Sequence, residues 1–162
     1  MLIKQQVEET MERRFETFTI QIAKISRNIL KIKTEEMSEF NLKSPHVSCL
    51  YYLYRANEAM TAKELSDICN EDKGAISRSI EFLEKEGYLT CDSKTGKRYK
   101  SPLSLTEKGE KVGQIIVKKI DNILENASEG LSEKNRKIFY DSLLLISDNL
   151  QKICENYGEK NG

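Results

Sequence analysis

Apolar residues recur along most of this chain at intervals of three and four residues, which is the period of one face of an α-helix. Near the N-terminus this spacing predicts a helix of about 25 residues or more, with a narrow apolar seam suited to packing against another helix. The seam consists of Met11, Phe15, Phe18, Ile22, Ile25, Ile29 and Ile32. The same period predicts a long last helix through Ile138, Phe139, Leu143, Ile146, Leu150 and Ile153.

Three shorter helices are predicted from signals at their ends. Ser44 followed by Pro45 is typical of an N-cap with proline at the first helical position. Thr61 and Glu64 have the spacing of a capping box, in which each side chain bonds the other residue's backbone N–H. That helix is expected to bury Ala62, Leu65, Ile68 and Cys69. Asp72 is the expected N-cap of the next helix, which buries Ile76, Ile80 and Leu83 and ends before Gly87.

A β-hairpin is predicted after Gly87. One strand covers residues 88–91, a turn covers residues 93–96, and the return strand covers residues 98–105. Pro102 fits the return strand only if that strand lies at an edge of its sheet. Thr106 is then the cap of another helix, which carries Val112, Ile115, Ile116, Ile120, Ile123 and Leu124.

The order of these elements predicts a fold that is mainly α with a small β-hairpin wing. A winged helix-turn-helix domain over residues 44–106 is flanked by a helical dimerisation region, residues 1–43 and 107–157, with a frayed tail at residues 158–162. The apolar seams of the terminal helices exceed what the small winged domain can cover, which favours a homodimer with intertwined terminal helices. A monomeric helical domain folded on itself is the alternative.

Composition narrows the class of function. The chain has 162 residues, 26 cations, 26 anions and a net charge of zero, so any attraction to nucleic acid must come from local clusters. No apolar run approaches a membrane span or a secretory signal, and a cytoplasmic protein is expected. One histidine, four scattered cysteines and no phosphate-binding or nucleophile motif argue against an enzyme, a metal site, a disulfide framework and a cofactor.

Two groups of residues are candidates for contact with DNA. The outer face of the helix that follows Asp72 carries Lys73, Gly74, Ser77 and Arg78, at the positions that a recognition helix uses on base edges and phosphates. The wing segment, residues 90–106, has a net charge of +3 from Lys94, Lys97, Arg98 and Lys100 against one aspartate. Residues 61–89 have a net charge of −3, however, so a winged-helix module that binds proteins instead of DNA is the alternative.

Several motifs in this order resemble the MarR family of transcriptional regulators, over about residues 10 to 155. The motifs are Thr61-Ala62-Lys63-Glu64-Leu65, Asp72-Lys73-Gly74-Ala75-Ile76-Ser77-Arg78, Phe82-Leu83-Glu84-Lys85-Glu86-Gly87-Tyr88-Leu89 and Leu105-Thr106-Glu107-Lys108-Gly109. The resemblance implies a homodimer that binds a palindromic operator, often as a repressor. Members of this family usually carry Asp-x-Arg in the wing, and the matching stretch here, Lys97-Arg98-Tyr99, lacks the aspartate.

The resemblance also implies release from DNA by a small aromatic or phenolic effector, which enters a cleft between the dimer helices and the winged domain. The candidates to line it are Ile22, Ile25, His46, Leu50 and Tyr51. The alternatives are a hydrogen-bonded surface or boundary histidine for His46 and ordinary packing for Tyr51. Some relatives sense oxidants through a cysteine in the first long helix, and this chain has none there. Cys49 and Cys69 are expected in the core, and Cys91 is expected to be the most exposed cysteine. The operator, the effector and the sign of regulation stay open.

Overall fold

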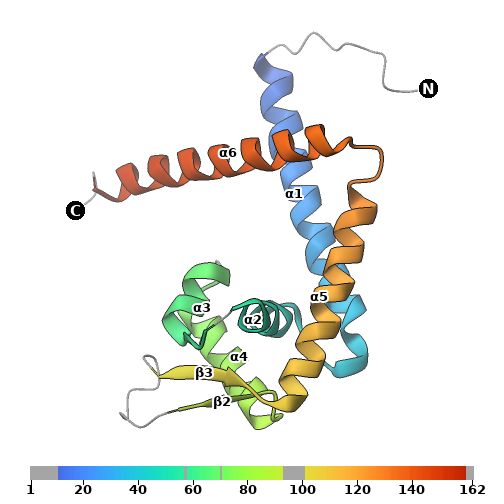
Figure 1. The fold of residues 1–162 in the computed structure, drawn as a ribbon. Helices are drawn as coiled ribbons and strands as arrows, with labels where there is room; N and C mark the ends of the chain where they lie inside the picture. The colour runs from blue at the N-terminus through green and yellow to red at the C-terminus, as the bar shows by residue number, and fades with distance from the viewer. Residues whose placement is uncertain (1–10, 57, 70, 93–100, 160–162) are drawn as a thin grey trace. The chain divides into compact units, whose positions relative to one another are not determined.

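The computed structural model of the protein describes residues 11–56, 58–69, 71–92 and 101–159, with side chains for all of these except residues 11–13, 15, 158 and 159. Within this part the chain is mainly helical with one small antiparallel sheet (Figure 1), so the predicted fold class is confirmed. The helices are α1 (Met11–Glu36), α2 (Ser44–Arg55), α3 (Ala62–Cys69), α4 (Lys73–Lys85), α5 (Glu107–Ala127) and α6 (Glu133–Glu159), with a short 3-10 turn, Ser38–Phe40, after α1. The strands are β1 (Met60–Thr61), β2 (Leu89–Cys91) and β3 (Pro102–Leu105).

The chain divides into two compact units, Met1–Lys119 and Ile120–Gly162, and the boundary lies inside α5. The first unit contains the sheet and most of the buried apolar side chains. The second contains the end of α5, a turn at Gly130 and α6.

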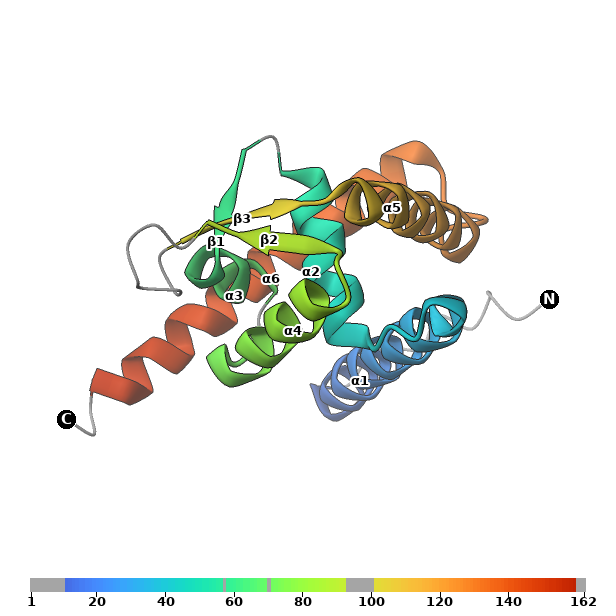
Figure 2. The same cartoon turned by 90° about the horizontal axis from the view of Figure 1, so that it is seen from below.

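Helix α2 lies at the centre of the first unit, where it contacts α1, α3, α4 and β3 (Figure 2). This position explains why its apolar residues form the middle of the core: Val47, Cys49, Leu50 and Leu53 are all buried. Around them the other elements contribute the buried side chains of Leu65, Ile76, Ile80, Leu83, Leu89, Leu103, Val112 and Ile116.

Two predicted caps form as expected at the starts of α3 and α4. The Thr61 backbone N–H donates to Glu64 Oε2 over 2.8 Å, and the Glu64 N–H donates to Thr61 Oγ1 over 3.3 Å. At α4, the Ala75 N–H donates to Asp72 Oδ1 over 2.9 Å. Each bond satisfies a backbone donor that has no partner inside its helix, so both helix starts are fixed by residues close in sequence.

The cap predicted at Ser44 is displaced by one residue. Lys43 is the N-cap of α2, and Ser44 and Pro45 fall within its first turn. The Lys43 backbone N–H donates to His46 Nδ1 over 3.1 Å, which is the bond that the N3 side chain makes in a capping box.

The sheet departs from the predicted two-stranded hairpin. A third strand, β1, was not predicted, and the strand order is β1-β3-β2, so β3 is the central strand. The prediction that the strand containing Pro102 lies at an edge is therefore wrong. Pro102 is tolerated because it is the first residue of β3, paired with Thr61, and its carbonyl accepts the Asp92 N–H over 3.0 Å. The predicted turn, residues 93–96, and the first residues of the return strand lie outside the described part of the chain.

A junction of backbone groups joins the end of α4 to the start of α5. Gly87 has a positive φ of 74°, which ends α4 in the left-handed conformation predicted for it. Thr106 then bonds this segment twice: its N–H donates to the Tyr88 carbonyl over 3.0 Å, and its hydroxyl donates to the Gly87 carbonyl over 2.6 Å. The Gly109 N–H in turn donates to Thr106 Oγ1 over 3.1 Å, so Thr106 is the cap of α5 as predicted.

Gly109 allows this junction to close. A Cβ atom at this position would overlap the carbonyl oxygen of Tyr88 and come within 3.1 Å of the Leu105 side chain. The ammonium group of Lys108 completes the contact, because it donates to the Glu86 carbonyl over 2.7 Å and lies 4.0 Å from the centre of the Tyr88 ring. The motifs around Gly87 and Gly109 that support the family resemblance are thus in contact with each other.

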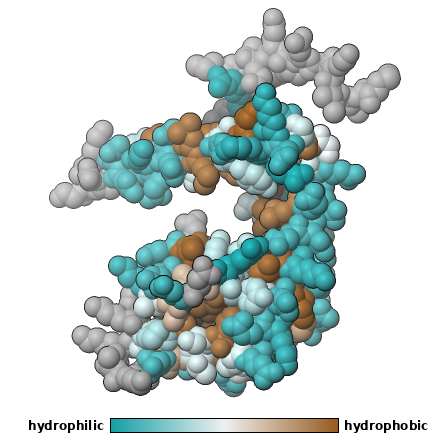
Figure 3. Space-filling model, in the orientation of Figure 1, coloured by the Kyte–Doolittle hydropathy of each residue, from teal (hydrophilic) through white to brown (hydrophobic). Residues whose placement is uncertain are grey.

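In the second unit, the Ser132 hydroxyl caps α6 by accepting the Asn135 N–H over 3.2 Å. The apolar seam predicted for this helix is exposed in the single chain, and apolar residues are visible along α6 in Figure 3. The exposed seam consists of Ile138, Phe139, Leu143, Ile146, Leu150 and Ile153. The predicted frayed tail begins within α6, which continues to Glu159, and residues 160–162 lie outside the described part.

The seam of α1 is also largely exposed, at Phe18, Ile22, Ile25 and Ile29, while Ile32 is half-buried. The side chains of Met11 and Phe15 lie outside the described part. Among the described helices, none has a stretch both long and apolar enough to cross a bilayer.

Substitution of Gly109 by alanine is expected to lower the free energy of unfolding by about 3 kcal/mol, since the added methyl group meets a backbone carbonyl that cannot move without breaking the bonds of Thr106. Urea unfolding followed by circular dichroism measures the change. The control is Gln114→Ala at an exposed position of the same helix, which should alter stability by less than about 0.5 kcal/mol. Equal effects of the two substitutions would contradict the role given to Gly109.

Candidate functional site

Helix α4 presents a polar surface at its first two turns. Lys73, Ser77 and Arg78 are exposed, and Gly74 is half-buried between them. The opposite side of the same helix is buried through Ile76, Ile80 and Leu83, as predicted. Because the apolar stripe fixes how α4 is turned about its axis, the three polar side chains lie on its outer face.

The turn that leads into α4 is held by side-chain bonds to the backbone. The Ser66 hydroxyl of α3 donates to the Glu71 carbonyl over 3.1 Å, and Asp72 caps the helix from the next position. Inside α4 the Ser79 hydroxyl, which is buried, donates to the Ala75 carbonyl over 2.9 Å. The orientation of α4 relative to α3 is therefore set by polar contacts as well as by packing.

Gly74 and Arg78 share the space at the start of α4. A Cβ atom at position 74 would lie 3.0 Å from Asp72 Oδ1 and 3.3 Å from Arg78 Nη1. The guanidinium group of Arg78 thus folds back along the first turn, beside the cap. This geometry places a cation with several donors on the outer face of the first turns, where it can donate to a phosphate or to a base edge.

The predicted wing cations, Lys94, Lys97, Arg98 and Lys100, lie outside the described part of the chain. The base of the wing is described: Thr90 pairs with Ser104 and Cys91 with Leu103 across β2 and β3. Of the residues predicted to contact DNA, the structure therefore describes Lys73, Gly74, Ser77 and Arg78, which lie together on α4.

Comparisons with known proteins identify this arrangement. Residues 46–124 match a family model described as a winged helix DNA-binding domain. A MarR transcriptional regulator from Methanosarcina mazei Go1 is 25% identical, with a TM-score of 0.74, 85% of this chain covered and 92% of that one. A putative MarR-family regulator from Listeria monocytogenes, solved with a 26mer DNA, is 26% identical, with a TM-score of 0.71 and coverage of 82% and 87%. The chain thus contains a winged helix DNA-binding domain and shares the fold of MarR transcriptional regulators.

A third MarR structure, from Staphylococcus aureus and in complex with salicylate and kanamycin, shares the fold at 17% identity, with a TM-score of 0.75 and coverage of 88% and 95%. Among curated protein sequences, no significant match to the chain was found.

The residues predicted to line an effector cleft differ in accessibility. Ile22 and Ile25 are exposed on α1, Tyr51 is half-buried on α2, and Leu50 is fully buried in the core. His46 is buried too, since its ring stacks on Phe82 of α4 with 4.1 Å between ring centres and a 9° angle between the planes. This stack joins the start of α2 to α4, and sequence reasoning missed it because the two residues are far apart in the chain.

The four cysteines are free thiols. Cys49 is buried as predicted, whereas Cys69, also expected in the core, is only half-buried. The hydrogen bond with the Cys69 thiol and burial raise the pKa of Cys49, which therefore stays protonated at neutral pH. The expectation that Cys91 is the most exposed is wrong: Cys91 is half-buried in β2, whose backbone pairs with β3, and Cys154 on α6 is the exposed cysteine.

The stability of the winged helix domain is expected to fall as the pH decreases below 6.5, the ordinary pKa of histidine. Burial, and then the charge of Lys43, lower the pKa of His46 in the folded chain. The unfolded chain consequently binds a proton at a pH where the folded chain does not, and stability is lost between 6.5 and the lower folded-state pKa.

Because His46 is the single histidine, its imidazole signals can be followed by NMR through a pH titration, with the free energy of unfolding measured alongside. Comparison with His46→Gln isolates this contribution, since the variant should lack this component of the pH dependence. A folded-state pKa at or above 6.5 would contradict the assignment.

Proposed function

We propose that this chain regulates transcription by binding double-stranded DNA as a homodimer, and that it represses at a palindromic operator. The observation that carries the proposal is the polar outer face of α4, where Lys73, Ser77 and Arg78 are exposed on a helix whose other side is locked into the core. An exposed helix of this kind fits the major groove. The DNA complex of the Listeria relative supports the same use of the fold.

Within this interface each group has a distinct role. Arg78 donates to a guanine edge or to a phosphate, and Lys73 and Ser77 contact the backbone or neighbouring bases. The missing side chain of Gly74 leaves room for the Asp72 cap and for the Arg78 guanidinium group beside it. The wing residues Lys94, Lys97, Arg98 and Lys100 contact phosphates or the minor groove, without the aspartate that usually accompanies the wing arginine in this family.

The exposed apolar seams support the homodimer. Isolated exposed apolar residues are ordinary, but continuous stripes along α1 and α6 are typical of surfaces that another chain covers. We infer that residues 1–43 and 107–157 of two chains pack together and bury at least about 1,200 Å² in total. Two α4 helices related by a two-fold axis then read half-sites about 10 base pairs apart.

We further propose that a small aromatic or phenolic effector controls DNA binding from a cleft next to Ile22, Ile25 and Tyr51, closed on the core side by His46 and Leu50. The apolar side chains exposed on α1 support this location. The staphylococcal structure with salicylate and kanamycin shows that a MarR protein of this fold holds small molecules.

The acidity of the helix-turn-helix favours one alternative. Residues 61–89 have a net charge of −3, which opposes approach to DNA and suits a module that binds a protein partner. The alternative predicts no duplex affinity even at low salt. Selection of duplexes from a random library by the purified protein therefore decides between the two functions and supplies the operator.

Substitution of Arg78 by alanine is expected to weaken operator binding by about 1 to 3 kcal/mol and to relax the preference at one base position. Fluorescence anisotropy with the selected operator and with single-base variants measures both effects. Lys152→Ala removes one positive charge from an exposed position of α6 and serves as the matched control. Retention of full affinity and selectivity in the Arg78 variant would refute its place in the interface.

Substitution of Lys94 by alanine is expected to act differently, because a phosphate contact carries no sequence information. Affinity should fall by a similar factor for all duplexes, and the slope of log affinity against log salt should decrease by about 1. A salt titration of the same anisotropy signal measures the slope. An unchanged slope, or a loss confined to one operator sequence, would contradict the phosphate contact.

Paired substitution of Ile146 and Leu150 by glutamate is expected to convert the dimer to a monomer, since it buries charge in the proposed interface. Sedimentation equilibrium measures the mass, and circular dichroism confirms that the helices remain. Leu144→Glu is the control, because a step of 100° per residue places Leu144 on another side of α6, where it is 65% exposed. A wild-type monomer, or a dimer that survives the paired substitution, would refute this interface.

A further inference from the structure

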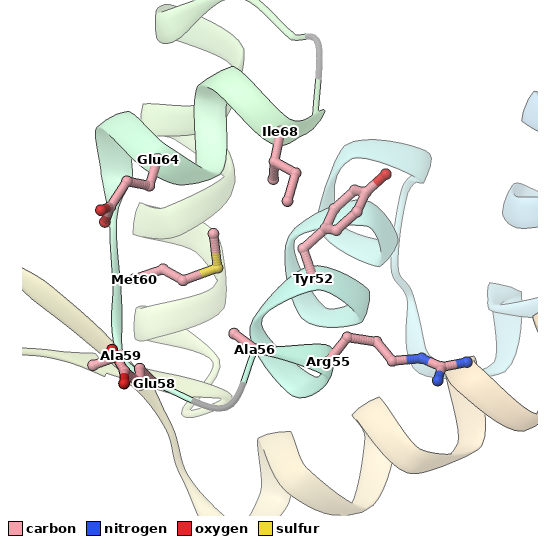
Figure 4. A pocket seen from close by; sticks show the side chains of 8 residues that line it. All are labelled: Tyr52, Arg55, Ala56, Glu58, Ala59, Met60, Glu64 and Ile68. Carbon is pink, nitrogen blue, oxygen red and sulfur yellow. The ribbon is translucent and has the colours of Figure 1, made fainter. Parts of the chain in front are cut away.

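A hollow of about 560 Å³ opens on the first unit between the end of α2, the segment leading into β1, and α3 (Figure 4). Its volume lies within the range of about 300 to 1,000 Å³ that is common for small-molecule sites. The residues that line it are Tyr52, Arg55, Ala56, Glu58, Ala59, Met60, Glu64 and Ile68. None of them belongs to the predicted effector cleft or to the polar face of α4.

The walls of the hollow are mainly apolar. In Figure 4 the side chains of Met60, Ile68 and Tyr52 extend toward the same space, with Ala56 at its floor. The prediction that Ile68 packs into the core is wrong: its side chain is 49% exposed, because it borders this open space. A flat apolar molecule would cover the exposed part of Ile68 and remove apolar surface from water.

The charged side chains around the hollow point in different directions. Glu58 and Glu64 lie at one rim, whereas the guanidinium group of Arg55 points away from the hollow toward α5, with its central carbon 5.7 Å from the centre of the Tyr51 ring (Figure 4). Thr61 holds Glu64 by bonds from both its N–H and its hydroxyl, each 2.8 Å long. These bonds lower the pKa of Glu64, so its carboxylate is ionised at neutral pH.

We propose that this hollow binds a small molecule built from a flat apolar ring system and a single positive charge. The ring lies between Met60, Ile68 and the face of Tyr52, and the cation lies toward the Glu58 and Glu64 carboxylates. An anion of the same shape is disfavoured, because two carboxylate side chains line the hollow and the guanidinium group of Arg55 is turned away from it.

The position of the hollow connects it to the wing. Met60 belongs to β1 and pairs with Leu103 of the neighbouring strand β3. A ligand that packs on Met60 therefore contacts both the first helix of the helix-turn-helix and the strand that pairs with the base of the wing. Binding of such a ligand does not depend on the proposed DNA-binding function, and its test contains no DNA.

Three compounds with the same ring distinguish charge from shape: 1-naphthylmethylammonium, 1-naphthalenemethanol and 1-naphthoate. Isothermal titration of each into the full chain gives the affinity and the stoichiometry. We expect one naphthylmethylammonium per chain, with the neutral alcohol weaker and the anion at least about tenfold weaker than the cation. No binding of the cation, or equal binding of cation and anion, would overturn the proposal.

Two substitutions locate the bound cation. Ile68→Ala should lower the affinity for the cation by about tenfold, because the ring loses its contact with this side chain. Ile115→Ala, at a partly exposed isoleucine of α5, should leave the affinity unchanged. Glu58→Gln should reduce the ratio of cation to anion affinity by about fivefold, with Glu110→Gln on α5 as its control.

Circular dichroism and thermal unfolding of each variant confirm that the fold is retained, and Ile68 and Glu58 are exposed positions whose replacement leaves the core intact. Ile68→Lys is the second variant for the same wall, since a lysine there repels the cation and should abolish its binding. Affinity that is unaffected by both Ile68 substitutions would place the compound elsewhere and overturn the proposal.

Discussion

The contact of the Gly87–Tyr88 backbone with the start of α5 is the constraint on which the arrangement of the winged domain depends. Thr106 bonds both carbonyls, and the missing side chain of Gly109 lets the helix approach the Tyr88 oxygen. These bonds join backbone to backbone, or a short side chain to backbone, so they leave little freedom in angle. They fix where α4 ends, where β2 leaves and where α5 begins.

The same junction helps to determine which side of α4 faces outward. The helix is closed at one end by Gly87 and at the other by Asp72, and its apolar stripe packs into the core beneath. With both ends and one side fixed, the outer side has a single orientation, which is that of Lys73, Ser77 and Arg78. A rigid scaffold of this kind is what a recognition surface needs, because side chains reach base edges in register only when the helix axis is defined.

Apolar periodicity has two different meanings in this chain. In α4 the stripe of Ile76, Ile80 and Leu83 is buried within the chain, whereas the equally regular stripe of α6 is exposed in the single chain. Both helices obey the same rule, namely that an apolar face requires a cover, but the rule does not say whether the cover belongs to the same chain. The proposed dimer and the proposed ring site of the hollow are both responses to apolar surface that this chain leaves uncovered.

The sequence by itself determined the helices, most of their caps and the overall fold class, because those features depend on residues within four positions of each other: Thr61 with Glu64, Asp72 with Ala75, and Gly87 at the end of α4. It also identified the outer residues of α4, since burial of one stripe defines the opposite side. The tertiary structure alone decided what depends on distant residues. Examples are the pairing of β1 that makes β3 central, the stack of His46 on Phe82, and the open hollow beside Ile68. Local periodicity records which side of an element is apolar, but it contains no information on which distant element lies opposite, and that choice is made only when the whole chain packs.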